Sequence, residues 1–186
     1  MAENPNNLMQ FFEFVGWFVT EFAKLEHLLR RCLRASTGLS ADAFDKIMGY
    51  PRTDDATSKL RKLIPPSLSN EAKADVTSAL DQLGKLSQLR NWIVHYGGHS
   101  VDDPPDHFLI RLNPKERSAE TGEPYIIIPR PEAWAACADV SSAGWLLTAH
   151  LDTAIELETR QLMLEHQPQP WRYKPPRLAQ SRQGRP

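Results

Sequence analysis

Residues 70–98 read NEAKADVTSALDQLGKLSQLRNWIVHYGG, and their apolar side chains recur with the period of an α-helix. At about 100° per residue, five of these side chains fall in one arc of the helix surface, which is expected to face a core. The five are Val76, Leu83, Leu86, Ile93 and Val94. Ser69 or Asn70 can cap the start of this helix, and the paired glycines at 97–98 end it.

A single arginine, Arg90, is predicted to lie in the middle of this apolar arc. An unpaired buried charge is costly, and an arginine cannot lose its proton. We therefore expect Arg90 to meet an anion, either a carboxylate of the fold or a phosphate of a ligand. Asn91 and His95 lie at the edge of the arc, one helical turn apart, where their side chains can act together.

The remaining sequence predicts a mainly α fold, an antiparallel bundle of four principal helices. Two of them precede the helix at 70–96 and are expected at 8–36 and 53–64, with a short helix at 41–48 between them. Apolar residues of the first helix recur at spacings of four and three, as in bundle packing. They are Phe11, Val15, Phe18, Phe22, Leu25, Leu29 and Cys32.

A small β-hairpin is expected between the third and fourth helices. Residues 107–112 and 125–128 are rich in β-branched and aromatic residues and flank a polar, turn-rich segment. Because two strands alone are marginally stable, the hairpin must pack on the helices. The fourth helix is expected at 131–165, with Pro131 in its first turn. Its predicted core residues are Val140, Leu147, Leu151, Ala154, Ile155 and Leu162.

Composition limits the class of protein. Residues 1–165 are predicted to form one domain, and the formal net charge of −1 argues against a dedicated duplex-DNA binder. Cys32 and Cys137 are expected to be reduced core residues. The polar first ten residues are unlike a signal peptide, and no stretch is long and apolar enough to span a bilayer. We therefore expect a cytoplasmic protein.

Residues 166–186 form a basic, proline-rich tail with five basic residues and no acidic ones. This composition predicts disorder or an extended arm. Trp171 and Tyr173 alternate with Arg172 and Lys174, a pattern that also fits a hook for RNA or for a protein partner.

Several common signatures of catalytic and ligand sites are missing from the sequence. It has no glycine-rich phosphate loop, no Gly-x-Ser-x-Gly elbow and no His-Glu-x-x-His motif. His95 and His99 are four residues apart, but the glycines between them break the helical geometry that would bring them together on a metal. No metal or cofactor is therefore expected.

The sequence allows two interpretations of Glu26. Helical projection places it on the apolar side of the first helix, where a carboxylate needs a partner. It can be an edge carboxylate that reaches solvent, or it can orient Arg90 or His95.

Arg90, Asn91 and His95 together resemble the motif of the HEPN superfamily of small helical domains. Ribonuclease members carry an arginine, commonly followed by a polar residue such as asparagine, and then a histidine late in a bundle helix. The resemblance covers roughly residues 8–165, with the hairpin as an insertion. It implies a metal-independent endoribonuclease with a site formed across a homodimer, and it implies that the enzyme acts as a toxin or a defence effector.

The resemblance also implies roles for individual residues. His95 would handle protons, since an imidazole accepts and donates them near neutral pH. Arg90 would stabilise charge on the phosphorane, and Asn91 would hold the imidazole or the phosphate. The expected product is a 2′,3′-cyclic phosphate.

Two features leave alternatives open. In members paired with a nucleotidyltransferase antitoxin, a tyrosine stands two positions after the histidine, whereas here Tyr96 follows His95 directly, so control by modification of that tyrosine is in doubt. The alternative function is a non-catalytic helical module that binds a nucleotide or a protein. In that case Arg90 pairs with Glu26, and His95 only ends its helix.

Overall fold

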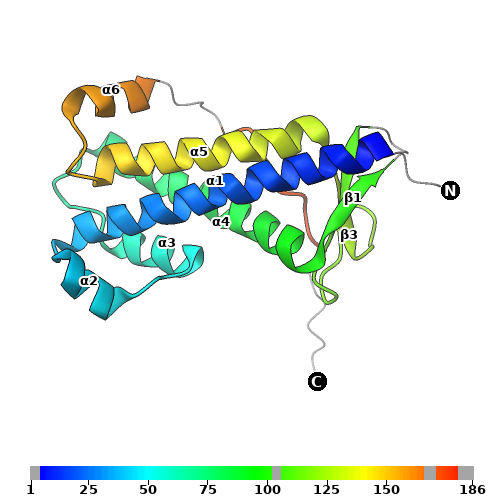
Figure 1. Cartoon of the computed structure of the whole chain (residues 1–186), viewed down its shortest axis with the longest axis horizontal. Coiled ribbons are helices and arrows are strands. Elements are labelled where there is room, and N and C mark those ends of the chain that lie inside the picture. Colours follow the sequence, from blue (N-terminus) through cyan, green and yellow to red (C-terminus); the bar gives the residue numbers. More distant parts are fainter. Residues whose placement is uncertain (1–4, 102–105, 166–170, 180–186) are drawn as a thin grey trace.

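The computed structural model describes residues 5–101, 106–165 and 171–179 (Figure 1). Its elements, in chain order, are α1 (Pro5–Thr37), α2 (Ala41–Met48), α3 (Thr53–Lys62), α4 (Asn70–Tyr96), β1 (Gly98–Val101), β2 (His107–Arg111), β3 (Tyr125–Pro129), α5 (Arg130–Leu151) and α6 (Leu157–Glu165). The predicted mainly α fold with a small β insertion is confirmed.

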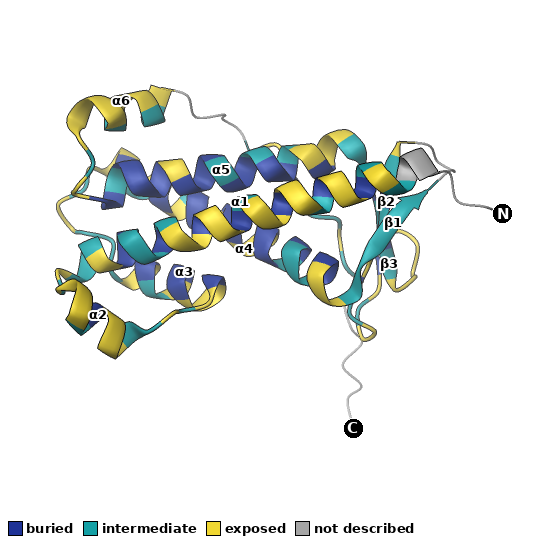
Figure 2. Ribbon diagram, viewed as in Figure 1, coloured by how far each residue is buried: buried dark blue, intermediate teal, exposed yellow. Residues whose placement is uncertain are grey.

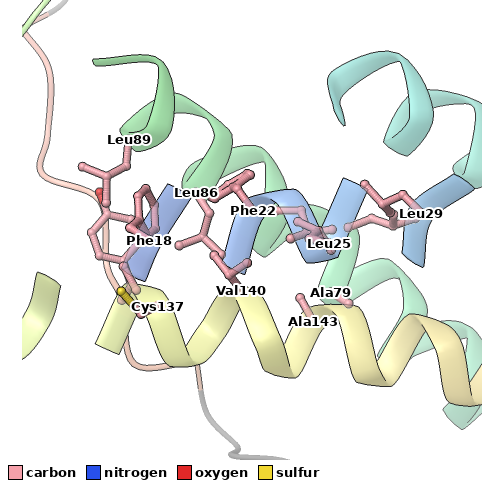
Figure 3. Close-up of a cluster of buried hydrophobic side chains, with 14 of the residues drawn as sticks. Phe18, Phe22, Leu25, Leu29, Ala79, Leu86, Leu89, Cys137, Val140 and Ala143 are labelled. Carbon is pink, nitrogen blue, oxygen red and sulfur yellow. The ribbon is translucent and has the colours of Figure 1, made fainter. Parts of the chain in front are cut away.

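Three long helices form the body of the molecule. Both α1 and α5 run away from the sheet, and α4 returns toward it, antiparallel to both (Figure 1). The shorter α3 packs against α1 and α4. The predicted apolar seam of α1 is buried apart from Val15, which is partly buried. Its side chains meet those of α4 and α5 in one cluster, in which Figure 3 labels Phe18, Phe22, Leu25, Leu29, Ala79, Leu86, Leu89, Cys137, Val140 and Ala143.

The sheet has three antiparallel strands in the order β1-β2-β3, one more than the predicted hairpin. The additional strand β1 starts at Gly98, directly after α4. One face of the sheet packs on α1, as expected: Phe108 stacks on Phe14, with ring centroids 5.2 Å apart, and meets Phe11 edge-on at 5.4 Å. The sheet is thereby fixed to the end of the bundle at which α4 stops.

The prediction of one continuous fourth helix is wrong, because α5 ends at Leu151 and α6 begins at Leu157. Asp152 explains the break. Its carboxylate pairs with Arg31 of α1 at 2.6 Å and also accepts the backbone N–H of Ala154 at 3.0 Å, which turns the chain. Ala154 and Leu162, predicted to face the core, are exposed, and no residue of α6 is buried (Figure 2).

Of the two states predicted for the tail, disorder or an extended arm, residues 171–179 adopt the second and lie as an extended arm on the body. The Tyr173 side chain is buried, and Trp171 Nε1 donates to Ser78 Oγ on α4 at 2.7 Å. Further along, Leu178 forms a β-bridge with Ser118 in the loop between β2 and β3. Buried polar partners therefore hold the arm, which its composition did not indicate. Residues 166–170 and 180–186 lie outside the described residues.

Candidate functional site

The end of α4 is built as the sequence predicts. Ser69 caps the start of the helix by accepting the backbone N–H of Ala72. Gly97 ends the helix with a φ of 72°, which favours glycine, and its N–H donates to the carbonyl of Ile93 at 3.1 Å. His95 therefore lies in the last turn of α4, beside the sheet.

The buried face of α4 differs from the predicted arc. Leu89 and Trp92 are buried, whereas Val94 is 47% exposed. Trp92 is held in the buried face because its indole Nε1 donates to Glu116 Oε2 at 2.7 Å. Arg90 consequently lies at the edge of the buried face and is partly exposed, not in its middle.

A cleft of about 670 Å³ opens beside Arg90. Its walls come from α1, the start of α3, the second half of α4 and the loop that follows β2. All five of the residues singled out from the sequence line this cleft, namely Glu26, Arg90, Asn91, His95 and Tyr96. The structure therefore brings the predicted site residues of one chain together.

Glu26 does not pair with Arg90. In the described ranges no carboxylate forms an ion pair with Arg90, whose Nη1 donates to Asn91 Oδ1 at 3.4 Å. Glu26 Oε1 instead accepts the hydroxyl of Thr53 at 3.1 Å. Of the two alternatives for Glu26, the structure agrees with the edge carboxylate that reaches solvent, because the cleft exposes Glu26 at this level of α1.

His95 is exposed, and its ring lies edge-on to that of Tyr96, with centroids 6.3 Å apart. Within the part of the chain that the structure describes, no hydrogen bond ties up the imidazole nitrogens of His95. The amide oxygen of Asn91, the residue expected to hold the imidazole or a phosphate, lies toward Arg90 and not toward His95. An imidazole, a guanidinium and an amide thus share one open cleft.

The cleft is lined by both positively and negatively charged side chains. Arg52 and Arg90 lie in its lining together with the carboxylates of Glu26, Asp54 and Glu116. Sequence reasoning missed Arg52 and Glu116, because neither belongs to the helix that carries the motif. The indole hydrogen bond of Trp92 fixes Glu116, and with it the loop that forms one wall of the cleft.

A second cleft, of about 620 Å³, shares His95 and Tyr96 with the first. It lies on the sheet side, and its polar lining includes His99, Arg111, Arg117 and Tyr125. Sequence reasoning missed this cleft, because these residues come from three strands and a loop, and the pairing of the strands decides how close they lie.

Among the described residues, no group of three or more histidine, cysteine or acidic side chains is placed to hold a metal ion. Likewise, none of the described helices has both the length and the apolar character needed to cross a membrane. Comparisons with protein-family models, curated proteins and solved structures found no match to this chain.

Proposed function

We propose that this chain is a metal-independent endoribonuclease of the HEPN type, which acts in the cytoplasm on RNA at a site formed across a homodimer. One observation carries the proposal: Arg90, Asn91 and His95 line one open cleft, and no carboxylate within the described ranges forms an ion pair with Arg90. An arginine at a cleft surface that forms no ion pair with a protein carboxylate is suited to bind a phosphate.

The chemistry needs one group that accepts a proton and one that donates it. As the ribose 2′-oxygen bonds to phosphorus, its proton passes to a base, and the departing 5′-oxygen takes a proton from an acid. His95 of one copy serves as the base and His95 of a second copy as the acid. Arg90 stabilises the charge that develops on the phosphorane oxygens. The products are a 2′,3′-cyclic phosphate and a 5′-hydroxyl.

An apolar seam on the outer face of α1 supports self-association. Met9, Phe12 and Val19 are 68%, 57% and 39% exposed, and the small exposed residues Gly16 and Ala23 continue the same spacing of three and four. The spacing then reaches Glu26, in the wall of the first cleft. A two-fold interface on this seam would bury every such contact twice and would lie beside the cleft.

The decisive test of catalysis is incubation of the purified protein with a mixed RNA pool in EDTA. The wild type is expected to cleave, and His95→Ala and Arg90→Ala are expected to lose cleavage. His27→Ala and Arg34→Ala, which change exposed residues of the same types on α1 outside the first cleft, should cleave as the wild type does. Equal cleavage after either site substitution would show that the assigned site is wrong.

Self-association has a separate test, sedimentation equilibrium of Val19→Asp. Loss of the dimer in this variant supports the α1 seam as the interface. Trp17→Asp is the matched control, because Trp17 is also exposed on α1, at 54%, but points away from the seam. A wild type that stays monomeric at high concentration contradicts the homodimer.

The alternative function is a non-catalytic module that binds a nucleotide or a protein. The three carboxylates Glu26, Asp54 and Glu116 in the cleft favour the protein-binding form of this alternative, because they would repel the phosphates of RNA and of a nucleotide alike. In that case the RNA pool stays intact while the cleft still binds its ligand. If the chain is a toxin, its expression should slow growth, His95→Ala should relieve that effect, and an antitoxin is its expected partner.

A further inference from the structure

We propose that the second cleft is a subsite for the nucleotide next to the scissile phosphate, and that the substrate is single-stranded RNA. This inference rests on the proposed function. The subsite consists of His99, Arg111, Arg117 and Tyr125, and it meets the first cleft at His95 and Tyr96.

The pairing of the strands builds this surface. Arg111 and Tyr125 are direct partners in the β2–β3 register, and His99 is the partner of Leu109 in the β1–β2 register. Side chains of directly paired residues, and of residues two apart in a strand, lie on the same face of a sheet. The opposite face carries buried side chains, among them Phe108, which packs on α1, so His99, Arg111 and Tyr125 lie on the outer face. Arg117 joins them from the loop after β2.

The two clefts differ in charge. Arg111 and Arg117 line the second cleft with His95 and His99, and no described aspartate or glutamate lines it. The first cleft contains three carboxylates beside its two arginines. A phosphate backbone is therefore attracted toward the sheet side of His95, and the bound RNA is expected to run from the first cleft into the second.

Arg117 is held in place for this role. Its Nη1 donates to the backbone carbonyls of Pro114 and Glu116, each at 2.7 Å. A guanidinium has five N–H donors, so three of them remain for a phosphate. Glu116 is itself fixed by Trp92 of α4, and this links the arginine to the helix that carries His95.

The aromatic lining indicates single-stranded rather than duplex RNA. Tyr96 and Tyr125 both line the second cleft, where one or both rings can stack on an unpaired base. Bases in an A-form duplex are stacked on one another and offer no free face to a side chain. The outer face of a sheet with aromatic and arginine side chains is a surface to which unpaired bases bind.

Cleavage tests the subsite with oligoribonucleotides of increasing length. The wild type should cleave a trinucleotide about tenfold faster than the corresponding dinucleotide, in kcat/KM, when the added nucleotide is on one particular side of the scissile phosphate. Arg111→Gln combined with Tyr125→Ala should abolish this length advantage. Arg34→Gln, an exposed arginine outside both clefts, should preserve it. A length advantage that survives in the double variant would overturn the inference.

Binding gives a readout that does not depend on catalysis. In the His95→Ala background, fluorescence anisotropy should show a single-stranded oligonucleotide binding about tenfold more tightly than its duplex. Arg111→Gln should lower the slope of log affinity against log salt by about 0.7. If the wild type cuts no RNA but these binding differences appear, the proposed catalysis fails, and the second cleft stands only as a binding site for single-stranded RNA. If RNA is cut and strandedness and Arg111 make no difference to binding, the subsite fails.

Discussion

The backbone N–H of Tyr173 donates to Asp139 Oδ2 at 2.9 Å, and this hydrogen bond fastens the arm of residues 171–179 to the bundle. Asp139 is a fully buried residue of α5. The same carboxylate oxygen accepts Gln82 Nε2 of α4 at 2.8 Å, and the Gln82 amide also donates to the carbonyl of Tyr173 at 3.0 Å. Three segments distant in the sequence thus share one buried polar centre.

Replacing Asp139 with alanine should destabilise the protein by about 3 kcal/mol, because it leaves buried donors of Tyr173 and Gln82 without their charged acceptor. The free energy of unfolding in urea measures this loss. A loss below about 1 kcal/mol would show that the arm contributes little to stability.

Tyr173 provides the matched control for this prediction. Its hydroxyl is buried and has no hydrogen-bond partner among the described residues. Tyr173→Phe should therefore leave stability unchanged or raise it slightly, because no hydrogen bond is lost. Tyr173→Ala removes a buried ring and should cost about 3 to 5 kcal/mol.

Gly98 is expected to tolerate no side chain. A Cβ at this position would lie 2.3 Å from the backbone oxygen of Leu109, which is fixed by the β1–β2 pairing. Gly98→Ala should destabilise the protein by about 2 kcal/mol or more, measured by thermal unfolding. Gly84→Ala is the control, because an added Cβ there meets nothing within 4 Å, and a helical alanine should raise stability by about 0.5 to 1 kcal/mol. Equal effects of the two changes would contradict this account.

The sequence was sufficient where local periodicity and capping decide the structure. The sequence correctly predicted the buried seam of α1, the cap at Ser69 and the end of α4 at Gly97. Periodicity could not show that α5 breaks at Asp152, because the break depends on a carboxylate that pairs with Arg31, far away in the sequence.

The candidate site also has a part that local sequence predicted and a part that depends on tertiary packing. Arg90, Asn91 and His95 share a cleft because they share a helix, and their spacing indicated this. The exposure of Glu26 and the residues of the second cleft depend on how α1, the sheet and the loop after β2 pack together. Burial of Tyr173 likewise depends on Asp139, so the composition of the tail could not decide between disorder and an extended arm for residues 171–179.

Acid should weaken the contact between α1 and α5 at Glu21. Burial acts to raise the pKa of this carboxyl, but hydrogen bonds from Lys24 and Ser141 and the charge of Lys24 lower it by more. Because the folded-state pKa lies below the unfolded value, the stabilisation is present above the unfolded pKa and is lost as the pH falls through the folded pKa.

Glu21→Gln should therefore lower Tm most at about pH 7 and progressively less toward about pH 3. Thermal unfolding across this range measures the difference. Glu13→Gln, which changes another glutamate on α1 that is exposed, should follow the wild-type pH profile. A Glu21→Gln deficit that does not change with pH would mean that the lowered pKa is not the cause.

The two thiols are expected to be unreactive in the folded protein. Cys32 and Cys137 are both free and buried, and burial raises the pKa of each thiol to about 12. The thiolate is the reactive form, so at about pH 8 only about one thiol in ten thousand is ionised. Ellman's reagent should therefore detect no thiol in the native protein and both after denaturation in guanidinium.

Ser58→Cys supplies the positive control for that measurement, because Ser58 is an exposed residue of α3 and its thiol should react at once. Prompt reaction of a native cysteine would mean that the interface between α1 and α5 opens in solution. Slow reaction at the rate of global unfolding would instead agree with a closed core, since both thiols lie in the cluster that joins these helices.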